Sequence, residues 1–175
     1  MAKKVYQIKA TIADIKPPIW RRVVIADSMS LEALHFVLQK AFGWEGYHMH
    51  EFIVDRVHYG TTGGEDWGDE VKSESVRVGS ILKQGTVFNY LYDFGDGWKH
   101  KLKVEKVSDA DPGTRYPLCL AGSRACPPED CGGPWGYQDL LEALSDQSHP
   151  QHDDMLGWVG GGFDPEAFDP SELSW

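Results

Sequence analysis

Two histidines lie two residues apart in a stretch where apolar and polar side chains alternate. His48 and His50 fall within residues 47–59, where this alternation predicts a strand, so both imidazoles are expected on one face. His100 lies on the apolar face of a second alternating run, residues 98–107, and a neighbouring strand would bring it to the pair. Imidazoles with a thiolate or carboxylate as fourth ligand suit zinc or another divalent metal. The alternative is that these histidines are hydrogen-bonded structural residues.

Two carboxylates and two thiols share a proline-rich segment. Cys126 and Cys131 are separated by four residues, which include Glu129 and Asp130. The remaining thiol in the chain is Cys119, so the four-cysteine set of a structural zinc site is absent from the sequence. Two prolines stiffen the loop, and its two carboxylates are candidates for lining a pocket and for a general base. The alternative is an exposed acidic turn.

A glycine-rich turn carries two further aspartates. Residues 92–97 (YDFGDG) contain the Asp-Phe-Gly triplet of protein kinases, but the chain has no glycine-rich phosphate loop and no His-Arg-Asp motif. Asp93 and Asp96 also lack the spacing of a helix-loop-helix calcium loop. We therefore interpret the segment as a tight turn whose aspartates accept backbone hydrogen bonds.

Five of the seven tryptophans stand next to a glycine. Large amphipathic rings beside flexible backbone favour a ligand groove or a partner-binding surface, whereas the alternative is that they close a small core. These residues are Trp44, Trp67, Trp98, Trp135 and Trp158.

Hydrophobic periodicity predicts the elements that position these residues. Strands are expected over residues 4–13, 19–25, 47–59, 86–94 and 98–107, the last two joined as a hairpin. Helices are expected over residues 31–42, between an N-cap at Ser30 and a stop at Gly43, over residues 137–144, and from near Pro150. The glycine-rich, acidic residues 60–75 are expected to form a surface excursion.

The order of these elements lacks the regular strand and helix alternation of a doubly wound fold. We expect a single α+β domain over residues 1–175, with a mainly antiparallel sheet. It should have one long helix in the N-terminal half and short helices in the C-terminal half. Residues 1–107 should form a strand-rich body, and residues 108–175 a loop-and-helix segment packed on it.

The net charge of −10 is concentrated in the C-terminal third. Residues 1–60 carry +2, residues 61–107 carry −1 and residues 108–175 carry −11. Such an acidic segment disfavours broad contact with phosphate backbones, so a protein or a small molecule is favoured over a nucleic acid as the partner. The one basic row, Lys99, Lys101 and Lys103, lies in the body.

The expected location is cytoplasmic. Three cysteines make no disulfide framework, which favours a reducing compartment. No apolar stretch is long enough to cross a membrane, so no membrane association is expected. The oligomeric state stays open.

The chain resembles the plasmid pRiA4b ORF-3-like family through several unusual strings in one order. These are PPIWRRV at 17–23, LHFVLQKAFGWEGYHMHEF at 34–52, YLYDFGDGWKHKL at 90–102, YPLCLAG at 116–122, ACPPEDCGGPWGY at 125–137 and FDPEAFD at 163–169. The family is uncharacterised, occurs in bacteria and archaea on plasmids and beside insertion elements, and includes members labelled as resolvases. A serine resolvase needs a nucleophilic serine surrounded by arginines, and this chain shows no such set.

The resemblance implies that a set of family-typical polar positions gathers into one cluster. In this sequence they are Arg21, His48, His50, Asp93, Asp96, His100, Glu129 and Asp130, with Cys126 also matching.

We therefore expect a ligand-binding or protein-interaction module with a cleft lined by histidine, aspartate and tryptophan. Its expected ligand-binding residues are Arg21, Asp93, Asp96, Trp98 and Cys126. The alternative is a metal-dependent hydrolase, for which nucleic acid is one candidate substrate. It would use His48, His50 and His100 as metal ligands and Glu129 or Asp130 as general base. The sequence assigns no cofactor, although zinc or another divalent metal would fit the alternative.

Overall fold

A computed structural model of the protein describes residues 4–60, 71–72 and 75–175. Within these residues eight strands form one sheet in the order β5-β4-β3-β6-β7-β1-β2-β8, and neighbours run antiparallel except for β4 and β5. The strands are β1 (Lys4–Ile12), β2 (Trp20–Ala26), β3 (His50–Val54), β4 (Val57–Gly60), β5 (Val71–Lys72), β6 (Val87–Tyr92), β7 (Trp98–Asp109) and β8 (Leu118–Ser123). The expected α+β class with a mainly antiparallel sheet is confirmed.

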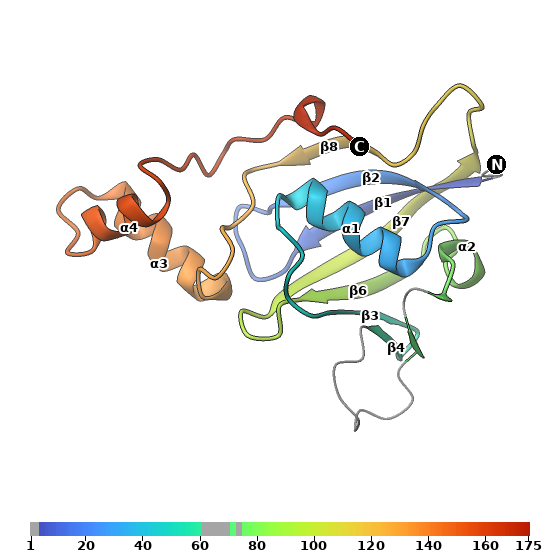
Figure 1. The fold of residues 1–175 in the computed structure, drawn as a ribbon, viewed down its shortest axis with the longest axis horizontal. Coiled ribbons are helices and arrows are strands. Elements are labelled where there is room, and N and C mark those ends of the chain that lie inside the picture. The colour runs from blue at the N-terminus through green and yellow to red at the C-terminus, as the bar shows by residue number, and fades with distance from the viewer. Residues whose placement is uncertain (1–3, 61–70, 73–74) are drawn as a thin grey trace.

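One helix, α1 (Leu31–Phe42), crosses one face of this sheet (Figure 1). It starts where the Ser30 side chain accepts the Ala33 N–H and stops at Gly43, whose φ of 100° is left-handed. Its apolar stripe, including Leu34 and Leu38, is fully buried against the sheet. We call the covered face of the sheet the inner face and the opposite one the outer face.

Strict alternation in β7 separates the two faces. Trp98, His100, Leu102 and Val104 are buried on the inner face, and the intervening lysines are exposed on the outer face. Because β6 and β7 form a hairpin, Tyr90 lies directly opposite His100 and shares that core. The hydrophobic core therefore lies between the inner face and α1, and it extends to buried residues of the helices at Val78–Ile81 and Gly133–Ser145.

The remaining helices are α2 (Val78–Ile81), α3 (Gly133–Ser145), α4 (His152–Trp158) and the 3-10 turn η2 (Pro170–Glu172). The pair α3 and α4, which we call the C-terminal extension, projects from one end of the sheet, and the chain then returns along β8 to η2 (Figure 1). None of the helices in the described ranges is long and apolar enough to cross a membrane.

Two expectations about the C-terminal third need correction. The helix expected over residues 137–144 runs over Gly133–Ser145, so with 13 residues it is no shorter than the 12-residue α1. Residues 118–123, expected as loop, form the edge strand β8 beside β2. The alternation rule misses β8 because its residues are half-buried on both sides, apart from Leu120. Most of the surface excursion expected over residues 60–75 lies outside the described residues.

Candidate functional site

Three loops meet at the end of the sheet from which the C-terminal extension projects. They are residues 43–49 between α1 and β3, residues 93–97 between β6 and β7, and residues 124–132 between β8 and α3; we call this the three-loop junction. The buried indole of Trp44 donates to the carbonyl of Pro127 over 3.0 Å, which fixes the first loop to the third.

Carboxylates make the other connections between these loops. Glu129 Oε1 accepts the backbone N–H of Glu45 at 2.9 Å and the hydroxyl of Tyr92 at 3.0 Å. Asp96 Oδ2 accepts the backbone N–H of Gly132 at 3.1 Å. The acidic side chains therefore act first as acceptors for loop backbone, as predicted for the aspartate turn.

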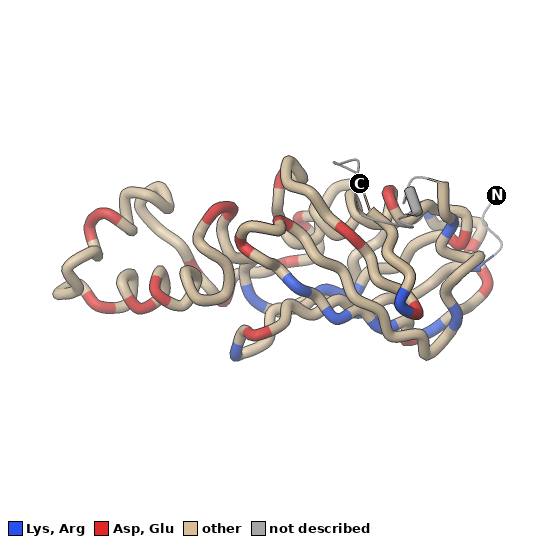
Figure 2. Tube along the Cα trace, turned by 90° about the horizontal axis from the view of Figure 1, so that it is seen from below, with Lys and Arg blue, Asp and Glu red and all other residues tan. Residues whose placement is uncertain are grey.

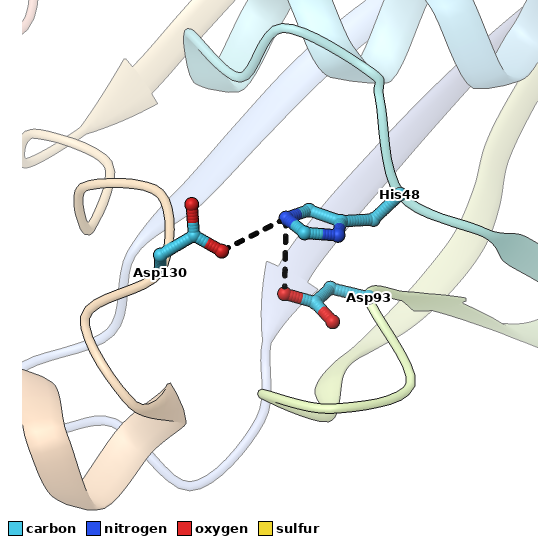
Figure 3. Close-up of side chains that lie close together, drawn as sticks. All are labelled: His48, Asp93 and Asp130. Atoms are coloured by element: carbon cyan, nitrogen blue, oxygen red, sulfur yellow. Dashed lines mark hydrogen bonds and ion pairs between the residues drawn. The ribbon is translucent and has the colours of Figure 1, made fainter.

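At the centre of the junction one imidazole faces two carboxylates (Figure 3). His48 Nε2 lies 3.0 Å from Asp130 Oδ1 and 3.5 Å from Asp93 Oδ2. In the described part of the chain, this is the one group of three or more metal-ligating side chains whose ligand atoms lie within 4.8 Å of one another. His48 Nε2 faces both acceptors, so a shared proton or a bound cation at this point would contact both carboxylates.

The second oxygen of each carboxylate is held by the protein. Asp93 Oδ1 accepts the backbone N–H groups of Gly95 at 2.9 Å and Asp96 at 3.3 Å. Asp130 Oδ2 accepts the hydroxyl of Tyr47 at 3.0 Å. Partial desolvation and this hydrogen bond raise the pKa of Tyr47 to about 12, so the phenol stays a donor. Each carboxylate thus presents one fixed oxygen to the imidazole.

Backbone conformation explains why aspartate occupies both positions. Asp93 and Asp130 have φ of 56° and 57°, in the left-handed region that short polar side chains tolerate better than others. A Cβ at Gly133 would lie 2.2 Å from the carbonyl oxygen of Asp96, so only glycine lets α3 begin this close to the turn.

Two open hollows flank Asp130. One of about 480 Å³ is lined by Tyr47, Pro128, Glu129, Asp130, Trp158, Val159 and Phe163. The other, of about 430 Å³, lies between the third loop and the C-terminal extension and includes Asp130, Cys131, Asp139, Asp154 and Trp158. Each hollow is therefore lined by both carboxylate and aromatic side chains.

The expected triad of His48, His50 and His100 is not formed in this structure. His50 stacks face to face on His35, with ring centroids 3.5 Å apart and planes inclined by 7°. His100 donates from Nδ1 to the carbonyl of Trp98 at 2.9 Å and is buried. The three expected ligands therefore divide between the junction, which holds His48, and the core, which holds His50 and His100. His48 precedes β3, where strand alternation does not apply.

Burial makes the core imidazoles poor bases. Removal from water lowers the pKa of His35 to about 3 and that of His100 to about 4. It also lowers the pKa of His50, against the opposing effect of Glu32, whose carboxylate lies 3.4 Å away. Tyr90 Oη accepts the side-chain amide of Gln39 at 2.8 Å, so its own proton is available to His35 Nδ1, also 2.8 Å away; this fits an unprotonated Nδ1 on a ring whose pKa is lowered.

Arg21, an expected ligand-binding residue, lies in the core. It is 1% exposed, donates from Nε to the carbonyl of Ala41 at 2.7 Å, and donates from Nη1 to two further carbonyls. Its guanidinium carbon lies 3.7 Å from the ring centroid of Phe168 and 5.1 Å from that of Phe42. These contacts tie β2 to α1 and to the C-terminal segment.

Trp98 and Cys126, two further expected ligand-binding residues, line neither of the two hollows, whereas Cys131 lines the second. Trp98 is fully buried, and its Nε1 has no hydrogen-bond partner among the described residues. Burial raises the pKa of Cys126 well above its usual range and that of Cys131 to about 12. Both thiols therefore stay protonated at neutral pH, which does not suit a nucleophile or a thiolate ligand.

Known proteins resemble this chain over nearly its whole length. A family model described as plasmid pRiA4b ORF-3-like protein matches residues 4–172. The chain belongs to this family. The uncharacterised protein y4hQ of Sinorhizobium fredii is 40% identical over 178 residues, covering 99% of this chain and 91% of that protein. The crystal structure of a protein of unknown function, MM3350 from Methanosarcina mazei Go1, matches with a TM-score of 0.92 at 36% identity and full coverage of both chains.

In this pRiA4b ORF-3-like chain the polar positions singled out by the resemblance fall into two groups. One group lies at the three-loop junction: His48, Asp93, Asp96, Glu129 and Asp130. The other is buried in the core: Arg21, His50 and His100. The expected single cluster is therefore two clusters with different chemistry.

Sequence reasoning missed several residues of both clusters. His35 and Gln39 are one turn apart on the buried face of α1, and both contact the Tyr90 hydroxyl. Residues four apart on a helix lie on the same face, and this spacing was the sequence signal that could have identified the pair. Phe163 lines the first hollow beside Trp158, one of the five glycine-flanked tryptophans, and no local pattern indicates that α4 brings the two together there.

Proposed function

We propose that this pRiA4b ORF-3-like chain is a protein-interaction module that binds a cationic segment of a partner at the three-loop junction. The observation that carries the proposal is the first hollow, where the carboxylates of Glu129 and Asp130 stand beside the rings of Tyr47, Trp158 and Phe163. Carboxylates attract ammonium and guanidinium groups, and aromatic faces add cation–π attraction of about 0.5–2 kcal/mol. A lysine or arginine side chain therefore fits this lining.

The surroundings of the hollow support the same ligand chemistry. Residues 108–175 carry a charge of −11, which would steer a basic segment towards this end of the molecule. Trp135 is 82% exposed, and Trp158 is 49% exposed. Exposed aromatic rings of this kind are typical of partner-binding surfaces.

Glu129 adds an unsatisfied acceptor. Its Oε1 already accepts two hydrogen bonds, whereas Oε2 is buried and has none within the described residues. No described donor offsets the negative charge at this oxygen, and that charge behind the wall of the hollow favours a cation in it.

Calorimetric titration with a short oligoarginine peptide tests the proposal. Binding should be saturable, should weaken with added salt, and should fall by about tenfold or more in Asp130→Asn, because one charge-assisted contact is lost. The matched control is Asp55→Asn, an exposed aspartate of the turn between β3 and β4 that also has positive φ. Equal binding of oligoglutamate, or equal losses in both variants, would contradict the proposal.

A second candidate, a metal-dependent hydrolase, is favoured by the geometry of His48, Asp93 and Asp130. Two ligands of one tetrahedral zinc ion, each about 2.1 Å from it, are about 3.4 Å apart. The measured separations from Nε2 are 3.0 and 3.5 Å. With Asp130 used as a ligand, Glu129 on the wall of the same hollow is the proposed general base.

Asp93 supplies the strongest support for this second candidate. It is 6% exposed, and its Oδ2 forms no hydrogen bond within the described residues, only the ion pair to His48. The backbone N–H groups of Gly95 and Asp96 already fix its other oxygen and so orient Oδ2.

Titration with Zn²⁺ and Mn²⁺ tests the metal site, and hydrolysis of bis(p-nitrophenyl) phosphate tests the activity. One equivalent of metal should bind, and both binding and hydrolysis should be lost in Asp93→Asn but kept in Asp55→Asn. Stoichiometric metal binding without turnover would refute the hydrolase but keep the metal site, and no binding would refute both.

A further inference from the structure

The outer face of the sheet carries a row of lysines. Lys99, Lys101 and Lys103 are exposed at alternate positions of β7, and Lys9 of β1 lies directly opposite Lys103. In Figure 2 the basic residues gather along this side of the body, whereas the C-terminal extension is acidic. No described element packs on this face.

None of these lysines is neutralised by an ion pair with a described residue. Glu105, the acidic residue nearest the row along β7, is held by both Nε and Nη2 of Arg22 at 2.7 and 3.0 Å. Directly opposed like charges such as Lys9 and Lys103 destabilise a sheet, so an external anion would relieve the repulsion.

An uncharged strip runs parallel to the lysine row. In the β6–β7 register the residues opposite Lys103, Lys101 and Lys99 are Val87, Asn89 and Leu91. Val87 is 48% exposed, and Asn89 is also exposed. On the other side of the row, Trp20 presents its ring beneath Lys9, with Nζ 4.6 Å from the ring centroid. The face thus combines one charged track with apolar, amide and aromatic groups beside it.

The acidic extension does not cancel this local charge. At physiological ionic strength the screening length is about 8 Å, so charges beyond that distance act weakly. Figure 2 shows the extension projecting from one end of the body, while the basic side follows the length of the sheet.

We propose that the outer face binds single-stranded nucleic acid along β7. The phosphates follow Lys99, Lys101, Lys103 and Lys9, while bases contact the Val87–Leu91 strip. A single strand has this same division between a charged backbone and flat bases. Reading a duplex needs an element that enters a groove about 12 Å wide, and a sheet face provides none among the described residues.

Fluorescence anisotropy with a labelled oligo(dT) tests this proposal. The logarithm of the binding constant should fall with the logarithm of salt concentration at a slope of about −2 to −3, as expected for three or four phosphate contacts. The triple variant K99E/K101E/K103E should lose binding by at least about a hundredfold at low salt.

A matched triple variant, K16E/K40E/K83E, changes the net charge equally at exposed lysines outside the row and should bind within about twofold of wild type. Thermal unfolding of both triple variants establishes that they fold. Val87→Ser should weaken binding about threefold and leave the salt slope unchanged, because the contact of this side chain with a base is not ionic.

Three results would overturn the proposal. They are equal losses in the two triple variants, tighter binding of a duplex of the same length, and stronger binding of oligoglutamate than of oligo(dT). The last result would identify an acidic protein segment as the partner of this face.

Discussion

Lowering the pH from about 7 to 5 should destabilise this fold by about 4 kcal/mol, because two core imidazoles cannot accept protons without leaving the core. His35 and His100 are 2% and 1% exposed, and their pKa values in the folded state are about 3 and about 4. In the unfolded chain both return to about 6.5. Between pH 6.5 and the folded-state pKa values, the unfolded state binds more protons than the folded state. The contribution of the two histidines to stability is therefore present above pH 6.5 and is lost as the pH falls.

The magnitude follows from linkage. A histidine with these two pKa values contributes a slope approaching 1.4 kcal/mol per pH unit, which amounts to about 2 kcal/mol between pH 7 and 5 for each residue. The lowered pKa of His50 adds to the loss in the same direction. Below this range, protonation of carboxylates contributes as well.

Urea denaturation at closely spaced pH values, followed by circular dichroism, measures the unfolding free energy. Asparagine offers an acceptor near the position of His35 Nδ1 and a donor near that of His100 Nδ1, so H35N and H100N keep the local hydrogen bonds. Each single variant should lose about 2 kcal/mol of the pH dependence, and the double variant most of it.

The control is Val104→Ala, which creates a cavity in the same core without a titratable group. It should lower the unfolding free energy by a similar amount at every pH and keep the wild-type slope. If H35N and H100N also keep the wild-type slope, the two imidazoles are not the groups responsible, and the reasoning fails.

Three further predictions concern stability and the junction. Ser30→Ala should cost about 1 kcal/mol of unfolding free energy, measured in urea, because the Ala33 N–H loses its cap, whereas Ser30→Asp should restore it. Arg21→Ala should cost about 3 kcal/mol or more, since it leaves a cavity and unpaired carbonyls; a loss below about 1 kcal/mol would show that these contacts are weak. Gly133→Ala should displace the third loop, because its Cβ would collide with the Asp96 carbonyl. The free energy of oligoarginine binding should then fall by more than the free energy of unfolding. Unchanged binding would show that this loop is not part of the binding site.

Local patterns were sufficient for several elements of the body, but not for residues 47–59, which were expected as one strand and form β3 and β4 on either side of a turn. Ser30 and Gly43 bound α1 at the expected residues, and period-two alternation assigned the buried and exposed sides of β7. The same rule failed for β8, whose pairing with β2 includes a register shift between Arg22 and Val23. An edge strand of small, half-buried residues is recruited by its neighbour rather than by its own pattern.

The candidate site was predicted only in part. The aspartate turn and the proline-stiffened loop were identified, and Asp93 and Asp130 do face the same imidazole. His50 was assigned to that imidazole's site because residues 47–59 alternate, but the strand begins at His50, and the two side chains diverge. Alternation constrains side-chain direction only where the backbone is already extended and paired.

Local sequence patterns are enough to establish the α+β class, the alternation in β7, the limits of α1 and the division of charge between body and C-terminal third. These are local quantities, set by periodicity, capping and composition within a few residues. Which polar groups meet depends instead on the tertiary structure. His48, Asp93 and Asp130 come from three loops far apart in the chain, and they converge because β3, β6 and β7 are neighbours in the sheet and the chain after β8 returns to the same end. That convergence depends on strand order, which no single segment specifies.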